Sequence, residues 1–136
     1  MRRRAEMVRT AILAGPRRVE LEEVSRVEPG PGQVRVRLAG CGLCGSNLPA
    51  WPGREWFRYR VPPGSPGHEG WGEIAAVGAG VRRLFEGDRV ALLSTGSFAE
   101  EEVALAELVV PLAELGRAFE ALEERREGFL KAVVVP

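Results

Sequence analysis

The chain has 136 residues, of which 45% are apolar and 28% are charged, and its 19 basic residues balance 19 acidic ones. This length suggests one domain, and the apolar content excludes an intrinsically disordered chain. The balanced charge argues against a nucleic-acid-binding protein, and no apolar run reaches the roughly 18 residues of a membrane span. Because the chain has two cysteines and no visible secretory signal, we expect it in the cytoplasm.

Most of the chain predicts short β-strands separated by glycine- and proline-rich turns. Residues 1–6, which include three arginines, are interpreted as a solvated tail, so that the domain is expected over residues 7–136. Apolar or alternating segments predict strands at 8–13, 19–22, 34–38, 71–77, 89–93, 101–105 and 108–110. Turns are expected at 29–32, 78–80 and 87–88, and a return strand is expected to start at Val81.

The pattern changes after Pro111, where apolar residues recur at helical spacing. They are Leu112, Leu115, Phe119 and Leu122. We expect a helix there, with Pro111 in its first turn and Gly128 after its end, followed by a final strand at 129–135. The predicted fold class is therefore mainly β, a small barrel or sandwich with one C-terminal helix and a final strand.

A metal site is the most specific chemistry that the residues suggest. His68 is the only histidine, which excludes motifs that need two histidines. An imidazole and the thiolate of Cys44 are both good zinc donors, and a catalytic zinc needs three protein ligands. The third ligand could be Glu69 or a carboxylate from residues 100–102. In the alternative interpretation, Cys44 is a packed thiol and His68 only forms a hydrogen bond in a loop.

Three other features allow competing interpretations. Cys41 and Cys44 form a CxxC, but the glycines around them do not support the helix of a thioredoxin-type pair, so Cys41 is interpreted as a small packed residue. Residues 78–83 resemble the start of a dinucleotide fingerprint but lie between two predicted strands, which favours a hairpin turn. The aromatic residues of the loop between Cys44 and His68 either wall an apolar pocket or pin the loop to the barrel.

Several segments resemble, in order, the catalytic domain of the zinc-type medium-chain dehydrogenase/reductase family, which includes alcohol and polyol dehydrogenases. The segments are PGPGQVRV (29–36), GLCGSNL (42–48), GHEGWGEI (67–74), VGAGV (77–81), GDRV (87–90) and GSFAE (96–100). The resemblance implies a GroES-like partly open β-barrel. Residues 115–122 and 128–134 resemble the family's C-terminal helix and final strand, which follow the nucleotide-binding domain in full-length members. Here they follow a seam at 110–112, so the Rossmann domain is expected to be missing.

The resemblance also assigns roles to individual residues. It implies that Cys44 and His68 are catalytic zinc ligands, that Glu69 is a conditional ligand beside them, and that the Ser46 hydroxyl relays the substrate proton. Asn47 stands where the family has an aspartate that supports the zinc-ligand histidine. An uncharged amide would polarise the imidazole less.

The expected function is that of an isolated catalytic domain related to zinc alcohol dehydrogenases, with a residual zinc site and no self-sufficient NAD-dependent activity. We do not expect NAD(P) to bind to this chain alone. In one alternative, a separate nucleotide-binding chain completes the oxidoreductase. In another, the chain is a non-catalytic binding or interaction module that self-associates through its exposed interdomain face.

Overall fold

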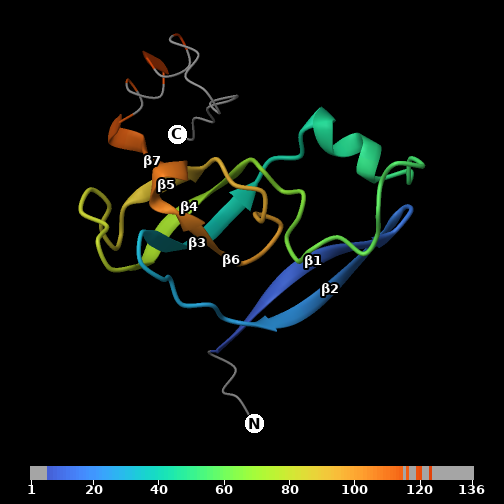
Figure 1. The fold of residues 1–136 in the computed structure, drawn as a ribbon, viewed down its shortest axis with the longest axis horizontal. Helices are drawn as coiled ribbons and strands as arrows, with labels where there is room; N and C mark the ends of the chain where they lie inside the picture. The colour runs from blue at the N-terminus through green and yellow to red at the C-terminus, as the bar shows by residue number, and fades with distance from the viewer. Residues whose placement is uncertain (1–5, 115, 117–118, 121–122, 124–136) are drawn as a thin grey trace.

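The computed structural model describes residues 6–114, 116, 119, 120 and 123, which fold mainly as β-strands (Figure 1). The strands are β1 (Met7–Gly15), β2 (Arg18–Ser25), β3 (Gln33–Cys41), β4 (Gly70–Val77), β5 (Arg89–Leu92), β6 (Glu101–Leu105) and β7 (Val109–Pro111). The 3-10 helices η2 (Gly45–Ala50) and η3 (Ala106–Leu108) lie between strands, and η4 (Leu112–Glu114) follows β7. The prediction of a mainly β chain is therefore confirmed.

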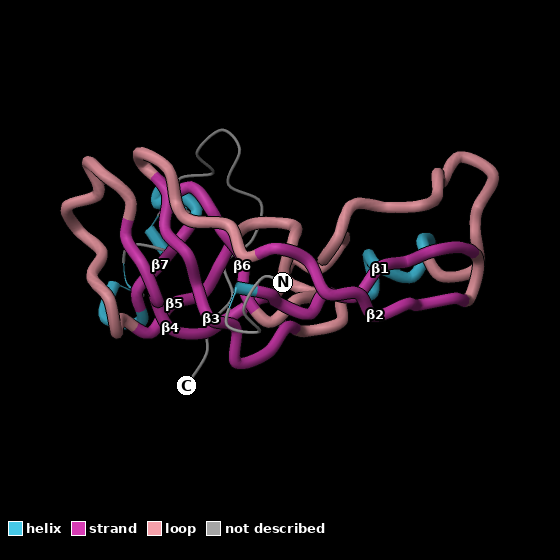
Figure 2. Tube along the Cα trace, turned by 90° about the horizontal axis from the view of Figure 1, so that it is seen from below, coloured by secondary structure: helices cyan, strands magenta, loops and turns pink. Residues whose placement is uncertain are grey.

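The strands form two antiparallel sheets. The larger has the order β6-β3-β4-β5-β7, and the smaller is the β1–β2 hairpin. Register shifts in the β3–β4 ladder, between Arg35 and Val36 and between Leu38 and Gly40, bend the larger sheet into a half-barrel. Figure 2 shows the hairpin extending away from this curled sheet. The Thr10↔Ala99 bridge joins β1 to the segment before β6.

The core lies on the concave side of the larger sheet and follows from strand alternation. In β3, Val34 and Val36 are fully buried, whereas the intervening Arg35 packs on the other face. The cluster also contains Ile74, Leu84, Val90, Leu92, Ala104 and Val109. Burying one Val, Leu or Ile side chain stabilises the fold by roughly 1.5–3 kcal/mol, so this cluster is the main stabilising element.

The return strand predicted at Val81 is wrong. After β4 the chain forms turns and irregular loop as far as Asp88, and β5 begins at Arg89. The Gly78 N–H donates to the Gln33 carbonyl at 2.8 Å, which docks the turn on the start of β3. Leu84 then enters the core from the loop, and the chain returns only at β5, which pairs antiparallel with β4. The described part of this segment contains no helix to bind a dinucleotide, in agreement with its interpretation as a turn.

The C-terminal prediction is partly confirmed, partly wrong and partly outside the described residues. Residues 116, 119, 120 and 123 are helical, as expected. Pro111 is the buried last residue of β7, paired with Val90, and does not lie in a helical turn. Phe119 is 60% exposed, so its predicted packing against the barrel is not formed. The contacts predicted for Leu115 and Leu122, the final strand at 129–135 and residues 1–5 of the tail all lie outside the described residues. Among those described, no helix is long and apolar enough to cross a membrane.

Candidate metal site

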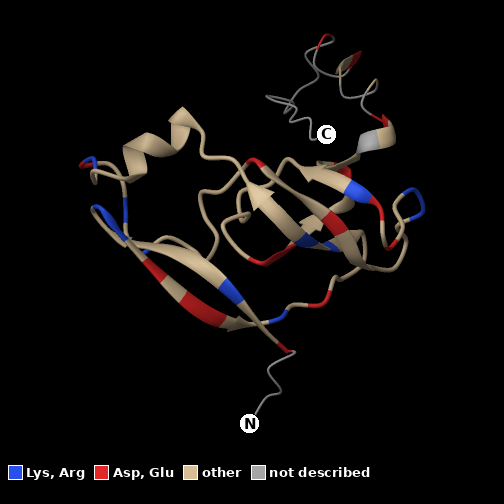
Figure 3. Cartoon of the chain, turned by 180° about the vertical axis from the view of Figure 1, so that it is seen from behind, with Lys and Arg blue, Asp and Glu red and all other residues tan. Residues whose placement is uncertain are grey.

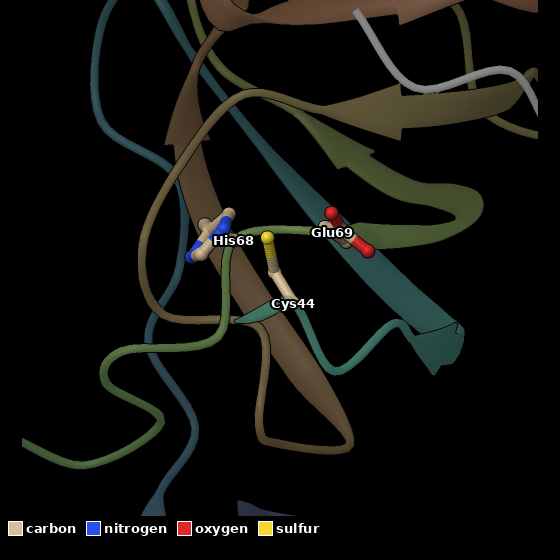
Figure 4. Close-up of side chains that lie close together, drawn as sticks. All are labelled: Cys44, His68 and Glu69. Carbon is tan, nitrogen blue, oxygen red and sulfur yellow. The ribbon is translucent and has the colours of Figure 1, made fainter. Parts of the chain in front are cut away.

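Cys44, His68 and Glu69 come together at one end of the larger sheet (Figure 4). Their candidate ligand atoms all lie within 4.8 Å of one another, and each residue is partly buried. Cys44 immediately precedes η2, and the other two residues immediately precede β4. The two segments that sequence analysis selected for a metal site therefore form one cluster.

The pairing of β3 with β4 explains why these segments meet. The ladder ends at the pair Cys41↔Gly70, so the two strands lead into the Cys44 segment and the Glu69 segment from neighbouring positions. The Gly42 N–H extends this contact by donating to the Glu69 carbonyl at 2.9 Å. A Cβ atom at Gly42 would overlap the Glu69 carboxylate. Glycine at this position leaves the space that the carboxylate uses.

Asn47 connects the two ligand-bearing segments. Its Oδ1 accepts a hydrogen bond from the Cys44 N–H at 2.9 Å, and its Nδ2 donates to the Pro66 carbonyl at 2.9 Å. The side chain is only 8% exposed. Because one end of the amide must accept and the other must donate, its orientation is set by these two backbone groups. The amide nitrogen also lies 3.3 Å from His68 Nδ1.

His68 has a different neighbour at each ring nitrogen. Nδ1 lies 3.0 Å from the Pro66 carbonyl, and Nε2 lies 3.2 Å from the Ser46 hydroxyl oxygen. A proton on Nδ1 satisfies the carbonyl and leaves the Nε2 lone pair free for a metal or for the Ser46 hydroxyl. The hydrogen bond with Cys44, and then that with the Pro66 carbonyl, raise the pKa of His68, although partial burial opposes the shift.

The carboxylates of residues 100–102, considered above as third ligands, are engaged elsewhere. The partners are Arg9 for Glu100, Arg26 and Arg35 for Glu101, and Ser97 for Glu102. Figure 3 shows that acidic and basic residues occur together on both the hairpin and the larger sheet. Within the described residues, Glu69 is therefore the carboxylate that joins Cys44 and His68.

Cys41 and the aromatic loop do not join the cluster. Burial raises the pKa of the Cys41 thiol, and this residue ends β3 instead of starting a helix, which disagrees with a thioredoxin-type pair. The Tyr59 hydroxyl donates to the Ala50 carbonyl at the end of η2, and Phe57 packs against Tyr59 with ring centroids 5.2 Å apart. These contacts join the loop to itself and not to the barrel, and Trp51 of the same loop lines a cavity described below.

Sequence reasoning missed the groups that hold the cluster in place. Gly42 and the Pro66 carbonyl were not selected, because a backbone carbonyl has no residue-type signal. Gly42 could have been noticed as one of the glycines around the cysteines. Ser46 and Asn47 were selected only through the family resemblance, and the structure places both beside His68.

Comparison with known proteins gives the family. The model of the alcohol dehydrogenase GroES-like domain matches residues 30–114. An alcohol dehydrogenase from Rhizobium meliloti (strain 1021) is 49% identical over 70 residues, which cover 52% of this chain and 20% of that protein. L-threonine 3-dehydrogenase from Pyrococcus furiosus is 39% identical over 74 residues, covering 54% of this chain and 21% of that protein. The match thus spans about a fifth of the length of these relatives.

A solved structure supports the same assignment. A short chain alcohol dehydrogenase from E. coli CFT073, solved in complex with NADH, superposes with a TM-score of 0.66 at 25% identity, covering 78% of this chain and 38% of that one. Its fold agrees with the half-barrel described above. The family match covers more than half of the chain and includes Cys44, Ser46, Asn47, His68 and Glu69. The chain therefore belongs to the alcohol dehydrogenase GroES-like domain family, as its resemblance to the zinc-type medium-chain dehydrogenases/reductases predicted.

Proposed function

We propose that this chain binds one zinc ion through Cys44, His68 and Glu69 and acts as the alcohol-activating domain of an alcohol dehydrogenase-type oxidoreductase. The observation that carries the proposal is the convergence of a thiol, an imidazole and a carboxylate within 4.8 Å. All three are zinc donors, and three protein ligands leave a fourth position open, as in catalytic zinc sites.

The donor set fits a zinc ion. Tetrahedral zinc with bonds of about 2.0–2.3 Å holds its ligand atoms roughly 3.3–3.8 Å apart. The atoms in this chain already lie within 4.8 Å, so small side-chain rotations suffice to close the site. The Pro66 carbonyl holds the His68 ring by accepting a hydrogen bond from Nδ1, which leaves Nε2 as the ligand atom.

The chemistry divides between the ion and the protein. When bound, zinc supplies a Lewis acid that polarises an alcohol oxygen and favours its deprotonation. The Ser46 hydroxyl, which is exposed and lies 3.2 Å from His68 Nε2, is placed to accept the alcohol proton and pass it to solvent. The carboxylate of Glu69 adds negative charge to the donor set, and the Pro66 carbonyl fixes the tautomer and orientation of the imidazole by accepting a hydrogen bond from Nδ1.

Hydride transfer requires a nicotinamide cofactor. We propose that NAD(P) is bound by a nucleotide-binding domain or partner chain and not by the described residues. The segment at 78–83 forms a turn without the helix N-terminus that a dinucleotide pyrophosphate needs. The E. coli relative that was solved with NADH supports a nicotinamide as the hydride acceptor.

Metal content is the first test. The protein is purified without chelators, and zinc per chain is measured for the wild type, Cys44→Ser, His68→Ala and Glu69→Gln. Cys41→Ser is the matched control, because Cys41 lies three residues away but outside the cluster. We expect about one zinc per chain in the wild type and in Cys41→Ser, and loss of zinc in Cys44→Ser and His68→Ala.

The absence of zinc from a correctly folded wild type would contradict the proposal and favour a non-catalytic binding module. A second assay addresses the cofactor. The zinc-loaded chain is incubated with NAD and a panel of alcohols, and NADH formation is followed by absorbance. We expect no turnover without a nucleotide-binding partner, so turnover by this chain alone would contradict that part of the proposal.

A further inference from the structure

A cavity of about 900 Å³ lies between the β1–β2 hairpin, the end of β3 and the segment that carries η2. These elements converge around the turn at residues 97–100, which also lines the cavity. Leu38 N–H donates to the Glu100 carbonyl at 2.9 Å, and the β3–β6 ladder ends at Arg37↔Glu101. The last residues of β3 therefore run past their β6 partner and form one wall of the cavity.

The rim of the cavity exposes apolar side chains. Leu43 is 82% exposed and Leu48 is 65% exposed, and Val19 and Trp51 are also exposed on this rim. These four belong to a set of ten large apolar side chains that are exposed within the described part of the chain. Such a concentration around one cavity marks a binding site, because exposed apolar residues are otherwise scattered singly.

The polar side chains of the lining are already satisfied. Glu100 pairs with Arg9 at 2.6 Å, and the Ser97 hydroxyl donates to Glu102. The Ser65 hydroxyl donates to the Thr95 carbonyl, and both ends of the Asn47 amide are used by backbone groups. A charged ligand would find no unpaired opposite charge among these groups, so the lining favours an uncharged apolar molecule.

We propose that this cavity binds an uncharged apolar small molecule, such as an aromatic or branched aliphatic compound. Its volume lies within the roughly 300–1,000 Å³ typical of small-molecule sites. Among the described residues, the lining includes Cys44 and Asn47 but not Ser46, His68 or Glu69. The ligand would therefore lie behind the Cys44 segment and not at the open coordination position, so the proposal does not depend on bound zinc.

The probe for the test is N-phenyl-1-naphthylamine, an uncharged aromatic amine whose fluorescence rises in apolar surroundings. It is titrated into zinc-free and zinc-loaded full-length chain. We expect saturable binding of one probe per chain in both forms, with energy transfer from Trp51, which lines the cavity. Because zinc content is measured separately, failure of the zinc proposal and failure of this one are distinguishable.

Two variants change the cavity through exposed positions. Leu48→Asp places a charge on the rim, and Ala39→Phe fills the β3 side. We expect each to weaken probe binding at least tenfold. The matched control is Leu21→Asp, because Leu21 is 73% exposed on β2 but outside the lining. Circular dichroism checks that each variant is folded.

Three outcomes would overturn the proposal. One is equal probe affinity in the wild type and both cavity variants, which would place the probe elsewhere. Another is binding of the probe only to zinc-loaded protein, which would place it at the metal. The third is loss of probe binding as protein concentration rises and the chain dimerises, which would mean that a second copy covers the face.

Discussion

The side-chain Oδ1 of Asn47 accepts a hydrogen bond from the backbone N–H of Cys44 at 2.9 Å. The opposite end of the same amide donates to the Pro66 carbonyl, two residues before His68. The two segments that carry the candidate ligands are therefore joined by a side chain that must both accept and donate. An amide can do both, whereas an ionised carboxylate can only accept. This explains the asparagine at a position where the zinc-type dehydrogenase family has an aspartate.

Replacing Asn47 by aspartate is expected to destabilise the zinc-free protein. A carboxylate would keep the bond from Cys44, but its second oxygen would face the Pro66 carbonyl, another acceptor, which would then have only His68 Nδ1 as a donor. Losing this bond in a buried site should lower the free energy of unfolding by about 1–3 kcal/mol. Urea denaturation in the presence of a chelator measures the change.

Asn47→Ala serves as the comparison, because it removes both hydrogen bonds without adding charge. If the cost of Asn47→Asp arises from facing acceptors, the aspartate variant should regain stability at low pH, where its carboxyl group is protonated and can donate. Asn47→Ala should show no such recovery. Equal stability of Asn47→Asp and wild type at neutral pH would contradict the argument.

Replacing Gly42 by alanine is expected to displace Glu69 from the cluster. A Cβ atom at Gly42 would overlap the end of the Glu69 side chain, which can rotate away at little cost to the fold. We therefore expect weaker zinc binding with little change in the zinc-free unfolding free energy. A competition titration against a chromophoric chelator measures the zinc affinity.

The neighbouring Gly45 provides a matched control for this prediction. A Cβ atom at Gly45 meets no heavy atom within 4 Å, although the residue adjoins Cys44 directly. Gly45→Ala should therefore keep the wild-type zinc affinity, whereas Gly42→Ala should behave like Glu69→Gln. If Gly42→Ala binds zinc as tightly as the wild type, Glu69 is not a ligand and zinc is held by the other donors.

The sequence predicted those parts of the fold that depend on local pattern. The alternation of residues 34–38 gave both the strand and its buried face, because period two is a property of the strand itself. For residues 78–88 the sequence predicted a turn but also a return strand at Val81 that does not form. The path of this segment depends on contacts with the distant start of β3. Pro111 was assigned to a helix because Pro suits a first turn, but tertiary packing places it in β7.

Only part of the candidate site could be predicted from the sequence. Residue types that bind zinc could be selected from the sequence, and β3–β4 pairing brings them together. The sequence left Glu69 and residues 100–102 as candidates for the third ligand. The structure favours Glu69 because residues 100–102 are bound by arginine and serine side chains that are distant in sequence or follow no motif. Local spacing contains no information about such partners.

The ion pairs of Glu101 predict a loss of stability in acid. Burial alone would raise the pKa of Glu101, but hydrogen bonds and charges from Arg26 and Arg35 outweigh it and lower the pKa below its usual value. A lowered pKa in the folded state stabilises the protein above the unfolded-state value of about 4.3, and this stabilisation is lost as pH falls through the folded-state pKa. Glu101 is 8% exposed at its side chain, so solvent screening is weak.

We expect Glu101→Gln to lower the unfolding free energy at pH 7 by about 3 kcal/mol, the lower end of the range for breaking a buried ion pair. The difference from the wild type should shrink as pH falls through the lowered folded-state pKa of Glu101, where the wild-type carboxylate becomes protonated. Glu100→Gln is the control, because the Glu100–Arg9 pair is exposed and should contribute much less. Urea denaturation from pH 7 to pH 3 tests both variants, and a pH-independent difference for Glu101→Gln would contradict the argument.

The hydroxyl of Ser97 is expected to stabilise the turn that supports His68. Ser97 is 2% exposed, and its Oγ donates to Glu102 at 2.5 Å while its N–H donates to the Gly67 carbonyl at 2.9 Å. Ser97→Ala would remove a buried donor to a carboxylate, so the unfolding free energy should fall by about 1–3 kcal/mol. Ser65→Ala removes an exposed hydroxyl bond of the adjoining loop and should have a smaller effect. Urea denaturation compares the two, and an equal loss in both variants would mean that water replaces the Ser97 hydroxyl as the donor to Glu102.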